Sequence, residues 1–211
     1  MIELILSGEG NSDIGEKDIK SQSFISGPIT VLTINMLNFF HKLDIKCHFI
    51  NRMQLKKYPM TLKGKKKREK IKTTGKGHAN LAYKLACIAR ENNYQVAILM
   101  RDASKNDFQS IYQEIMGGFE TAKYQNGVAA IPVPESEAWL ISCLDPKESK
   151  SIEGCKTDMK KLLEQKLLKR NQAHNKETWC EIAGKCAIEK VEAPSFNKYR
   201  NDLEKVVKYL F

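Results

Sequence analysis

The sequence predicts an α/β protein with a mostly parallel sheet, helices on both faces of the sheet and a C-terminal helical cap. Two observations lead to this prediction. Over residues 1–145, short apolar runs bounded by turn residues alternate with segments whose apolar residues recur at helical spacing. From residue 146 onward no strand pattern is evident, and helical spacing continues to the end of the chain. We therefore expect 1–145 to form an α/β core and 146–211 to form a helical extension packed on it.

The individual elements follow from these patterns in chain order. Strands are predicted at 2–6, 46–50, 95–100 and 127–133, where apolar runs stop at turn-forming or polar residues. Residues 11–26 are mostly polar and are predicted to form an exposed loop. Helices are predicted at 28–40, from a cap at Asn80, at 107–116 before a glycine pair, from Pro134, and at 156–169, 175–187 and 195–210, the last capped by Ser195. Trp139 and Trp179 fall on predicted helices and are interpreted as core anchors, because aromatic side chains bury large areas.

Composition indicates a globular protein of the cytoplasm. Hydrophobic residues make up 42% of the chain, which is too many for a disordered protein. No apolar run approaches the roughly 20 residues that a membrane span needs. The N-terminus lacks the basic region of a signal peptide, so we expect a cytoplasmic protein without a membrane partner.

The six cysteines show no pattern typical of a metal site or a disulfide framework. They form no CxxC pair, and no His/Cys cluster has zinc-finger spacing. Cys87 and Cys143 lie within apolar stretches and are interpreted as buried thiols. Neither a disulfide framework nor a structural zinc is expected.

The charge of the chain favours a polyanionic partner. Lys and Arg number 35 against 25 Asp and Glu, a formal net charge of +10, which suits nucleic acid, although basic proteins without such a partner exist. Positive charge is concentrated in a basic insertion at 52–78, which we interpret as a phosphate-contacting arm in preference to a solvated loop. Residues 75–78 lack the GxxxxGKS or GxxxxGKT pattern, so nucleoside triphosphate binding there is rejected. The predicted nucleic-acid-binding residues of the insertion are Lys63, Lys65, Lys66, Lys67, Arg68 and Lys76.

Acidic residues follow three of the predicted strands. Glu9 comes after the first strand, Asp102 after the third, and Glu135 and Glu137 after the fourth. Because the carboxyl ends of parallel strands lie along one edge, these side chains are expected to meet there. Several carboxylates at one edge are typical of a magnesium site, and two such ions can promote phosphodiester cleavage. The alternative is that each acid is a helix cap or a first-turn residue, which the helix dipole stabilises. This alternative explains any one of the acids by itself. Three acids on one sheet edge of a basic protein favour the metal site.

Several short motifs resemble those of a known family. Ser-Gly-Glu-Gly-Asn-Ser-Asp at 7–13, after a strand, resembles the opening motif of TOPRIM domains, which occur in topoisomerases, primases and OLD-type nucleases. Met-Arg-Asp-Ala-Ser at 100–104 stands where that family carries its DxD motif. Residues 137–140 (Glu-Ala-Trp-Leu) and 194–196 (Pro-Ser-Phe) are similar to motifs of small bacterial and archaeal TOPRIM-like proteins linked to mobile elements and antiphage defence. The resemblance spans 7–196 and implies a Rossmann-like, TOPRIM-like fold.

The resemblance also implies roles for individual acids. Glu9, Asp102 and Glu137 would be catalytic, and would bind Mg²⁺ or Mn²⁺ together with Asp107. Asp107 is included because Ser104 stands where the DxD motif has its second Asp, and Ser binds Mg²⁺ weakly. Asp13 matches the variable acid of the opening motif and is a secondary candidate.

These observations predict an enzyme, with one alternative from another class. The first prediction is a Mg²⁺-dependent TOPRIM-like nuclease that acts on DNA or RNA, in which Arg101 and Lys105 neutralise the scissile phosphate. The alternative, favoured by Ser104, is a catalytically weak TOPRIM-like scaffold that binds nucleic acid or a partner ATPase as a regulatory subunit. The resemblance alone implies a defence-system effector that works with an ATPase. A dinucleotide-binding or P-loop enzyme is excluded by the missing glycine motif.

Overall fold

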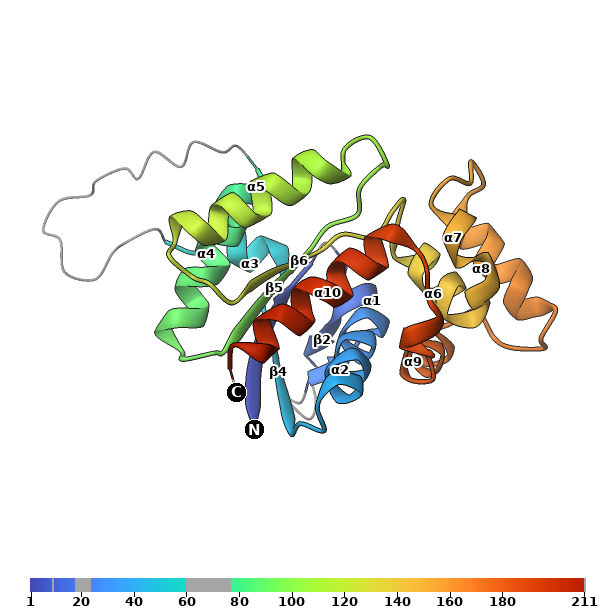
Figure 1. Ribbon diagram of the computed structural model, residues 1–211, viewed down its shortest axis with the longest axis horizontal. Helices are drawn as coiled ribbons and strands as arrows, with labels where there is room; N and C mark the ends of the chain where they lie inside the picture. The colour runs from blue at the N-terminus through green and yellow to red at the C-terminus, as the bar shows by residue number, and fades with distance from the viewer. Residues whose placement is uncertain (9, 18–23, 60–76, 211) are drawn as a thin grey trace, which may run out of the picture.

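The main sheet of the protein is parallel and four-stranded. The computed structural model describes residues 1–8, 10–17, 24–59 and 77–210, and structural statements below concern that part of the chain. The spatial order is β4-β1-β5-β6, where the strands are β1 (Ile2–Ser7), β4 (Ile45–Phe49), β5 (Val96–Met100) and β6 (Gly127–Ala130). β1 pairs with β4 on one side and with β5 on the other, all in the same direction (Figure 1). The predicted α/β class is confirmed, and the four strands lie close to where the apolar runs predicted them.

Alternate residues of the strands divide between the two faces of the sheet. Leu4 and Leu6 of β1 and Ile98 of β5 belong to one buried cluster. Ile5 of β1 and Leu99 of β5 belong to a second buried cluster. Because successive side chains of a strand point to opposite faces, both faces of the sheet are buried. This is the arrangement expected of a parallel sheet covered by helices on both sides.

Two pairs of helices cover these faces (Figure 1). α2 (Pro28–Phe40) and α10 (Pro194–Lys208) contribute to the first cluster, and α10 contacts both β6 and α2. α4 (His78–Glu91) and α5 (Phe108–Thr121) contribute to the second and pack on each other. The short helix α3 (Arg52–Lys57) follows β4, buries Leu55 and packs on α4. The predicted position of helices on both sides of the sheet is thus observed.

The C-terminal part of the chain is helical and shares the first cluster with the sheet. α6 (Ser136–Leu144) leads out of β6 into η1 (Pro146–Glu148), α7 (Ser149–Ile152), α8 (Met159–Leu168), α9 (Lys176–Gly184) and η2 (Ile188–Lys190), after which α10 returns to the sheet. Trp139 of α6 is fully buried, stacks on Tyr199 with 5.3 Å between ring centroids, and donates a hydrogen bond from Nε1 to Ser195 Oγ (2.8 Å). Trp139 is therefore a core anchor that ties α6 to α10. No helix in the described residues has the length and apolar character needed to cross a membrane.

The exposed loop predicted for 11–26 is wrong for the residues that the structure describes there. They form α1 (Asn11–Ile14) and a small antiparallel hairpin of β2 (Gly15–Lys17) with β3 (Phe24–Ser26); residues 18–23 lie outside the description. Ile14 is fully buried in the core. The close approach of β2 to β3 depends on Gly15. Its φ is +125°, and a Cβ at this position would lie 2.4 Å from the Ile25 carbonyl oxygen. The few apolar residues of this polar segment show no helical or alternating spacing from which to predict these elements.

Three predicted helix boundaries also differ from the structure. α5 continues through the glycine pair 117–118, because Gly118 lets it approach α4; a Cβ there would lie 2.2 Å from the Ala79 carbonyl oxygen. α4 begins at His78 with Gly77 as its N-cap, so Asn80 lies inside the first turn and not at the cap. α10 begins at Pro194, and Ser195 accepts the hydrogen bond from Trp139 instead of capping the helix. For Gly118 and Ser195, a tertiary contact uses a residue that local rules assign to a helix end.

One of the cysteine predictions is also corrected. Cys143 of α6 forms a disulfide with Cys186, which follows α9, so it is not the buried thiol that its apolar surroundings predicted. The two residues are 43 positions apart in sequence, and no spacing rule pairs them. Cys87 is a free, half-buried cysteine, and burial raises the pKa of its thiol.

Candidate functional site

Four carboxylates gather beyond the carboxyl ends of three strands, and we call them the acidic cluster. Asp13 lies on α1 after β1, Asp102 follows β5, and Glu135 and Glu137 follow β6 at the start of α6. The charges of the other three each raise the pKa of Asp102, which places all four within electrostatic reach of one another. The structure thus brings Asp102 and Glu137 together at one sheet edge. It adds Asp13, the secondary candidate, and Glu135.

Asp102 has the least satisfied side chain of this cluster. Its Oδ1 atom is buried and has no hydrogen-bond partner among the described residues. Burial is the largest cause that raises its pKa, to about 7, and the charges of Asp13, Glu137 and Glu135 act in the same direction. The neighbouring charge of Arg101 lowers the pKa but does not offset these causes. A carboxylate in this position would be stabilised by additional positive charge.

The first turn of α6 links the acids of two strands. Ser136 Oγ lies 2.6 Å from Asp13 Oδ1 and 3.2 Å from Glu137 Oε2, so its single O–H donates to the nearer carboxylate, Asp13 of α1, with Glu137 of α6 as the other acceptor within reach. Ser136 and Glu137 are almost completely buried. Burial raises the pKa of Glu137, and the charges of Glu135 and Asp13 raise it further. The nearest cation, Lys160 Nζ, is 4.0 Å from Glu137 Oε1 and largely exposed, so it contributes little.

The capping alternative accounts for only part of this arrangement. Glu135 is the N-cap residue of α6, but its side chain makes no capping hydrogen bond. Asp107 is the N-cap residue of α5 and makes none either. Glu137 lies in the first turn of α6, where the helix dipole stabilises negative charge. The dipole therefore helps to hold Glu137, while Asp102 is on a loop and receives no such support.

Other predicted site residues lie apart from the acidic cluster or outside the described chain. Asp107 and Lys105 are exposed, and Asp107 Oδ2 accepts a hydrogen bond from Ser104 Oγ at 2.6 Å. Asp107 is not among the charges that shift the pKa of Asp102. Arg101 is half-buried and next to Asp102. The residues outside the described part are Glu9, Lys63, Lys65, Lys66, Lys67, Arg68 and Lys76.

The fit of these residues to a divalent metal ion depends on Asp102. Within residues 1–8, 10–17, 24–59 and 77–210, no three His, Cys, Asp or Glu side chains converge closely enough to hold an ion by themselves. Mg²⁺ is usually bound by one or two carboxylates, with water and substrate phosphate completing its shell. The buried Oδ1 of Asp102, without a hydrogen-bond partner in the described chain, fits the role of such a ligand.

Sequence reasoning missed Ser136 and did not give Glu135 a role in the site. Glu135 was recognised as an acid after a strand, but the family resemblance pointed to Glu137 alone. Ser136 stands between two acids at a helix start, and this position could have indicated a hydroxyl that positions carboxylates. Its actual partner, Asp13, is 123 positions away in sequence, and no local pattern predicts that contact.

Comparisons with protein-family models, with curated proteins and with solved structures find no match to this chain. The TOPRIM resemblance therefore stays a prediction based on the short motifs quoted above.

Proposed function

We propose that the protein is a Mg²⁺-dependent, TOPRIM-like enzyme that hydrolyses phosphodiester bonds in nucleic acid. The observation that supports this most is Asp102, a half-buried residue at the carboxyl edge of a parallel sheet, whose buried Oδ1 atom has no hydrogen-bond partner in the described chain and whose pKa is raised by three further acids. Open α/β sheets bind their ligands at this edge. The net charge of +10 provides the electrostatic attraction for a polyanionic substrate.

In such a site, the residues would have different roles. Asp102, with Glu9, which follows β1 in the sequence and lies outside the described residues, would hold the ion; when bound, the ion would supply positive charge to the phosphate and activate water for attack. Ser136 would orient Asp13 through its hydroxyl, with Glu137 Oε2 also within hydrogen-bond distance, and the charges of both acids act on Asp102. Arg101 lies next to Asp102, where a guanidinium can neutralise a phosphate oxygen.

Replacement of Asp102 tests this proposal. Asp102→Asn keeps the size of the side chain but removes its charge, while Asp44→Asn makes the same change at an exposed residue before β4, at the opposite edge of the sheet. We expect the wild type to bind Mn²⁺ in calorimetry and to cleave labelled DNA or RNA with Mg²⁺ or Mn²⁺. Asp102→Asn should weaken both at least about 100-fold, since even residues behind a metal ligand contribute 10–100-fold.

The result for Asp44→Asn should be the same as for the wild type in both measurements. Glu9→Gln extends the test to the residue after β1 and should lose cleavage as well. A wild type that neither binds Mn²⁺ nor cleaves any single- or double-stranded nucleic acid would contradict the proposal. Unchanged Mn²⁺ affinity in Asp102→Asn would contradict the metal site.

One observation favours the second candidate function, a scaffold that binds nucleic acid or an ATPase without cutting. Asp107, the only acid considered as a replacement for the second Asp of the DxD motif, is exposed and hydrogen-bonded to Ser104. The described residues then offer a site with fewer ligands than two ions need. Nucleic-acid binding that survives Asp102→Asn, with no cleavage by the wild type, would support the scaffold.

A further inference from the structure

A second polar site lies at the same sheet edge, beside β4. A cleft of about 180 Å³ is bordered by α3 and by the first turns of α4, and its lining includes Arg52, Lys56, Gly77, His78, Asn80 and Lys84. α3 follows the carboxyl end of β4, and α4 starts near this edge before the chain enters β5. Strands are about 4.8 Å apart, so the ends of β4 and β5 are separated by roughly 10 Å. The basic cleft is therefore bordered by the helix that follows β4, whereas the acids of the acidic cluster follow β1, β5 and β6.

Lys84 is the most informative residue of the basic cleft. It is only 8% exposed, which is rare for a lysine without an acidic partner. Its Nζ donates to the carbonyl oxygen of Lys56, and burial is the cause that lowers the pKa of its ammonium group. An ammonium group has three donors, and the described residues provide one acceptor for it. A buried cation with spare donors in a cleft indicates an anionic ligand.

The surroundings of Lys84 are suited to the same ligand. Arg52 and Lys56 add two cationic side chains to the lining. α4 has 14 residues, and no side chain caps its N-terminus at Gly77, so the first N–H groups of the helix are available beside the cleft. The Nδ1 atom of His78 is buried without a hydrogen-bond partner in the described chain, and it can donate to a phosphate oxygen when it carries the ring proton.

One carboxylate lies close to the cleft and must be considered. Glu114 of α5 reaches toward Gly77, where an added Cβ would lie 3.9 Å from Glu114 Oε2. Gly77 has a φ of +88°, so a residue with a side chain would be strained there. The cleft contains three cations against this one acid at its rim, and its charge remains positive.

We propose that the cleft formed by Arg52, Lys56, Lys84 and the N-terminus of α4 binds a phosphate group. The proposal is independent of the acidic cluster, because none of its residues belongs to that cluster. It differs from the nucleoside triphosphate site that the sequence excludes, since a single phosphate group needs no GxxxxGKS or GxxxxGKT loop. The phosphate belongs either to a nucleic-acid 5′ end or to free inorganic phosphate.

The test compares two neighbouring lysines of α3. Lys56 lines the cleft, whereas Lys57 is an exposed residue of the same helix that does not. Binding of inorganic phosphate is measured by calorimetry in metal-free buffer with EDTA, so that failure of the metal site cannot affect the result. We expect Lys56→Ala and Lys84→Met to weaken phosphate binding at least tenfold, and Lys57→Ala to change it less than twofold. Lys84→Met keeps the length of the buried stem, and Lys56→Ala provides the test if that variant does not fold.

The second arm of the experiment identifies the source of the phosphate. Fluorescence anisotropy compares a short single-stranded oligonucleotide with a 5′-phosphate to the same strand with a 5′-hydroxyl. Tighter binding of the phosphorylated strand, lost in Lys56→Ala, assigns the site to nucleic-acid ends. Equal binding of the two strands, with phosphate binding that depends on Lys56, assigns it to free phosphate. No phosphate binding by the wild type at millimolar concentration, or equal losses in Lys56→Ala and Lys57→Ala, would overturn the proposal.

Discussion

The two ends of the carboxyl edge of the sheet have opposite charge and different support. At the acidic end, where the acidic cluster follows β1, β5 and β6, the cluster is backed by α6, whose Trp139 is fully buried against α10. At the β4 end, the basic cleft is bordered by α3, a helix of six residues with one buried side chain, Leu55. The strands provide the same kind of edge at both ends. The segments that follow the strands determine the charge at each end of the edge and the packing that supports it.

The difference reflects the cost of placing each kind of charge. Carboxylates are short, so acids that must lie close together have to be held there by a buried framework. Burial and the charges of neighbouring acids raise the pKa of Asp102 and Glu137. The ionised form of each carboxylate therefore destabilises the folded state. Lysine and arginine have long stems and can bring their charges to a cleft from a short, weakly packed helix. We therefore expect the acidic end to depend more strongly on core packing than the basic end.

The largest expected effect comes from removing the anchor of the acidic end. Trp139→Ala should lower the free energy of unfolding by about 3 to 5 kcal/mol, because it leaves a large cavity and an unpaired Ser195 hydroxyl. Leu55→Ala makes the matched change under α3 and should cost about 2 kcal/mol, the lower end for a buried leucine, since α3 packs mainly on α4. Urea unfolding measures both values. An equal loss of free energy of unfolding in Leu55→Ala and Trp139→Ala would contradict the expectation that the acidic end depends more strongly on core packing.

A smaller effect is expected in the pH dependence of stability. The pKa of Asp102 is about 7 in the folded protein and near 4 when unfolded, so between these values the folded state holds a proton that unfolding releases. The free energy of unfolding should therefore fall as the pH rises from 5 to 8. Relative to Asp102→Asn, which has no such proton, the fall should be on the order of 2 to 3 kcal/mol in metal-free buffer, since the pH passes through about two units below the folded pKa. A difference between the two proteins that does not change with pH would show that Asp102 titrates normally.

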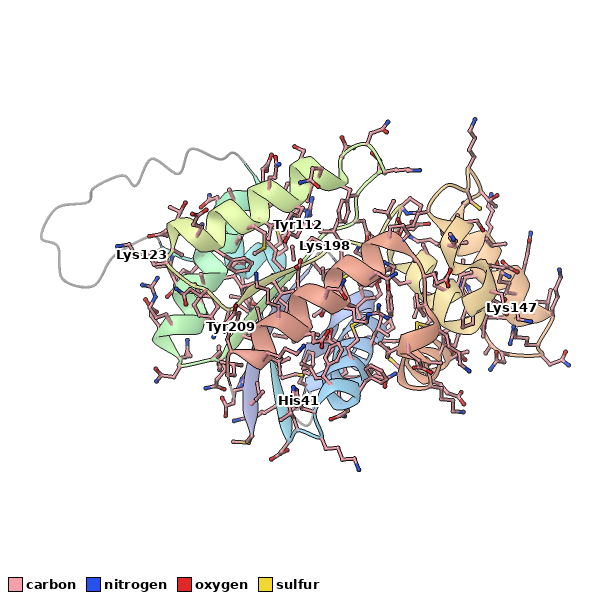
Figure 2. All side chains as sticks on the ribbon, in the orientation of Figure 1. His41, Tyr112, Lys123, Lys147, Lys198 and Tyr209 are labelled. Atoms are coloured by element: carbon pink, nitrogen blue, oxygen red, sulfur yellow. A yellow bond between two sulfur atoms is a disulfide. The ribbon has the colours of Figure 1, made fainter. Side chains whose placement is uncertain are left out.

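The smallest effect concerns a contact between α5 and α10, which lie on opposite faces of the sheet. Tyr112 donates to Asp202 (3.0 Å) and accepts from Lys198 (2.7 Å). Figure 2 labels Tyr112 on α5 and Lys198 on α10. Tyr112→Phe should cost about 1 kcal/mol, because Lys198 keeps its ion pair with Asp202. Tyr58→Phe, after α3, removes an exposed hydrogen bond to Glu91 and should cost less than about 0.5 kcal/mol. A larger loss for Tyr58→Phe in the same unfolding assay would reverse the proposed order of support.

Much of the fold could be predicted because its signals are local. The apolar runs that became β1, β4, β5 and β6 are bounded by turn residues, and α2 shows its buried face in its spacing. Predictions were wrong where one residue served a distant contact. Gly118 looked like a helix end but allows α5 to approach α4, and Ser195 looked like a cap but bonds to Trp139. The Cys143–Cys186 disulfide also joins elements that no spacing rule relates.

The sequence by itself determined the α/β class and placed acids after the strands, because periodicity and turn residues act over a few positions. It placed Asp102 and Glu137 at the same edge, since parallel strands share one. The contact between Asp13 and Ser136 near these acids is visible only in the tertiary structure. The same is true of the cleft that Lys84 and the start of α4 line. Strand order and crossover connections create these contacts between residues far apart in sequence. Local sequence patterns do not predict these contacts, because the contacting residues are neighbours in space and not in sequence.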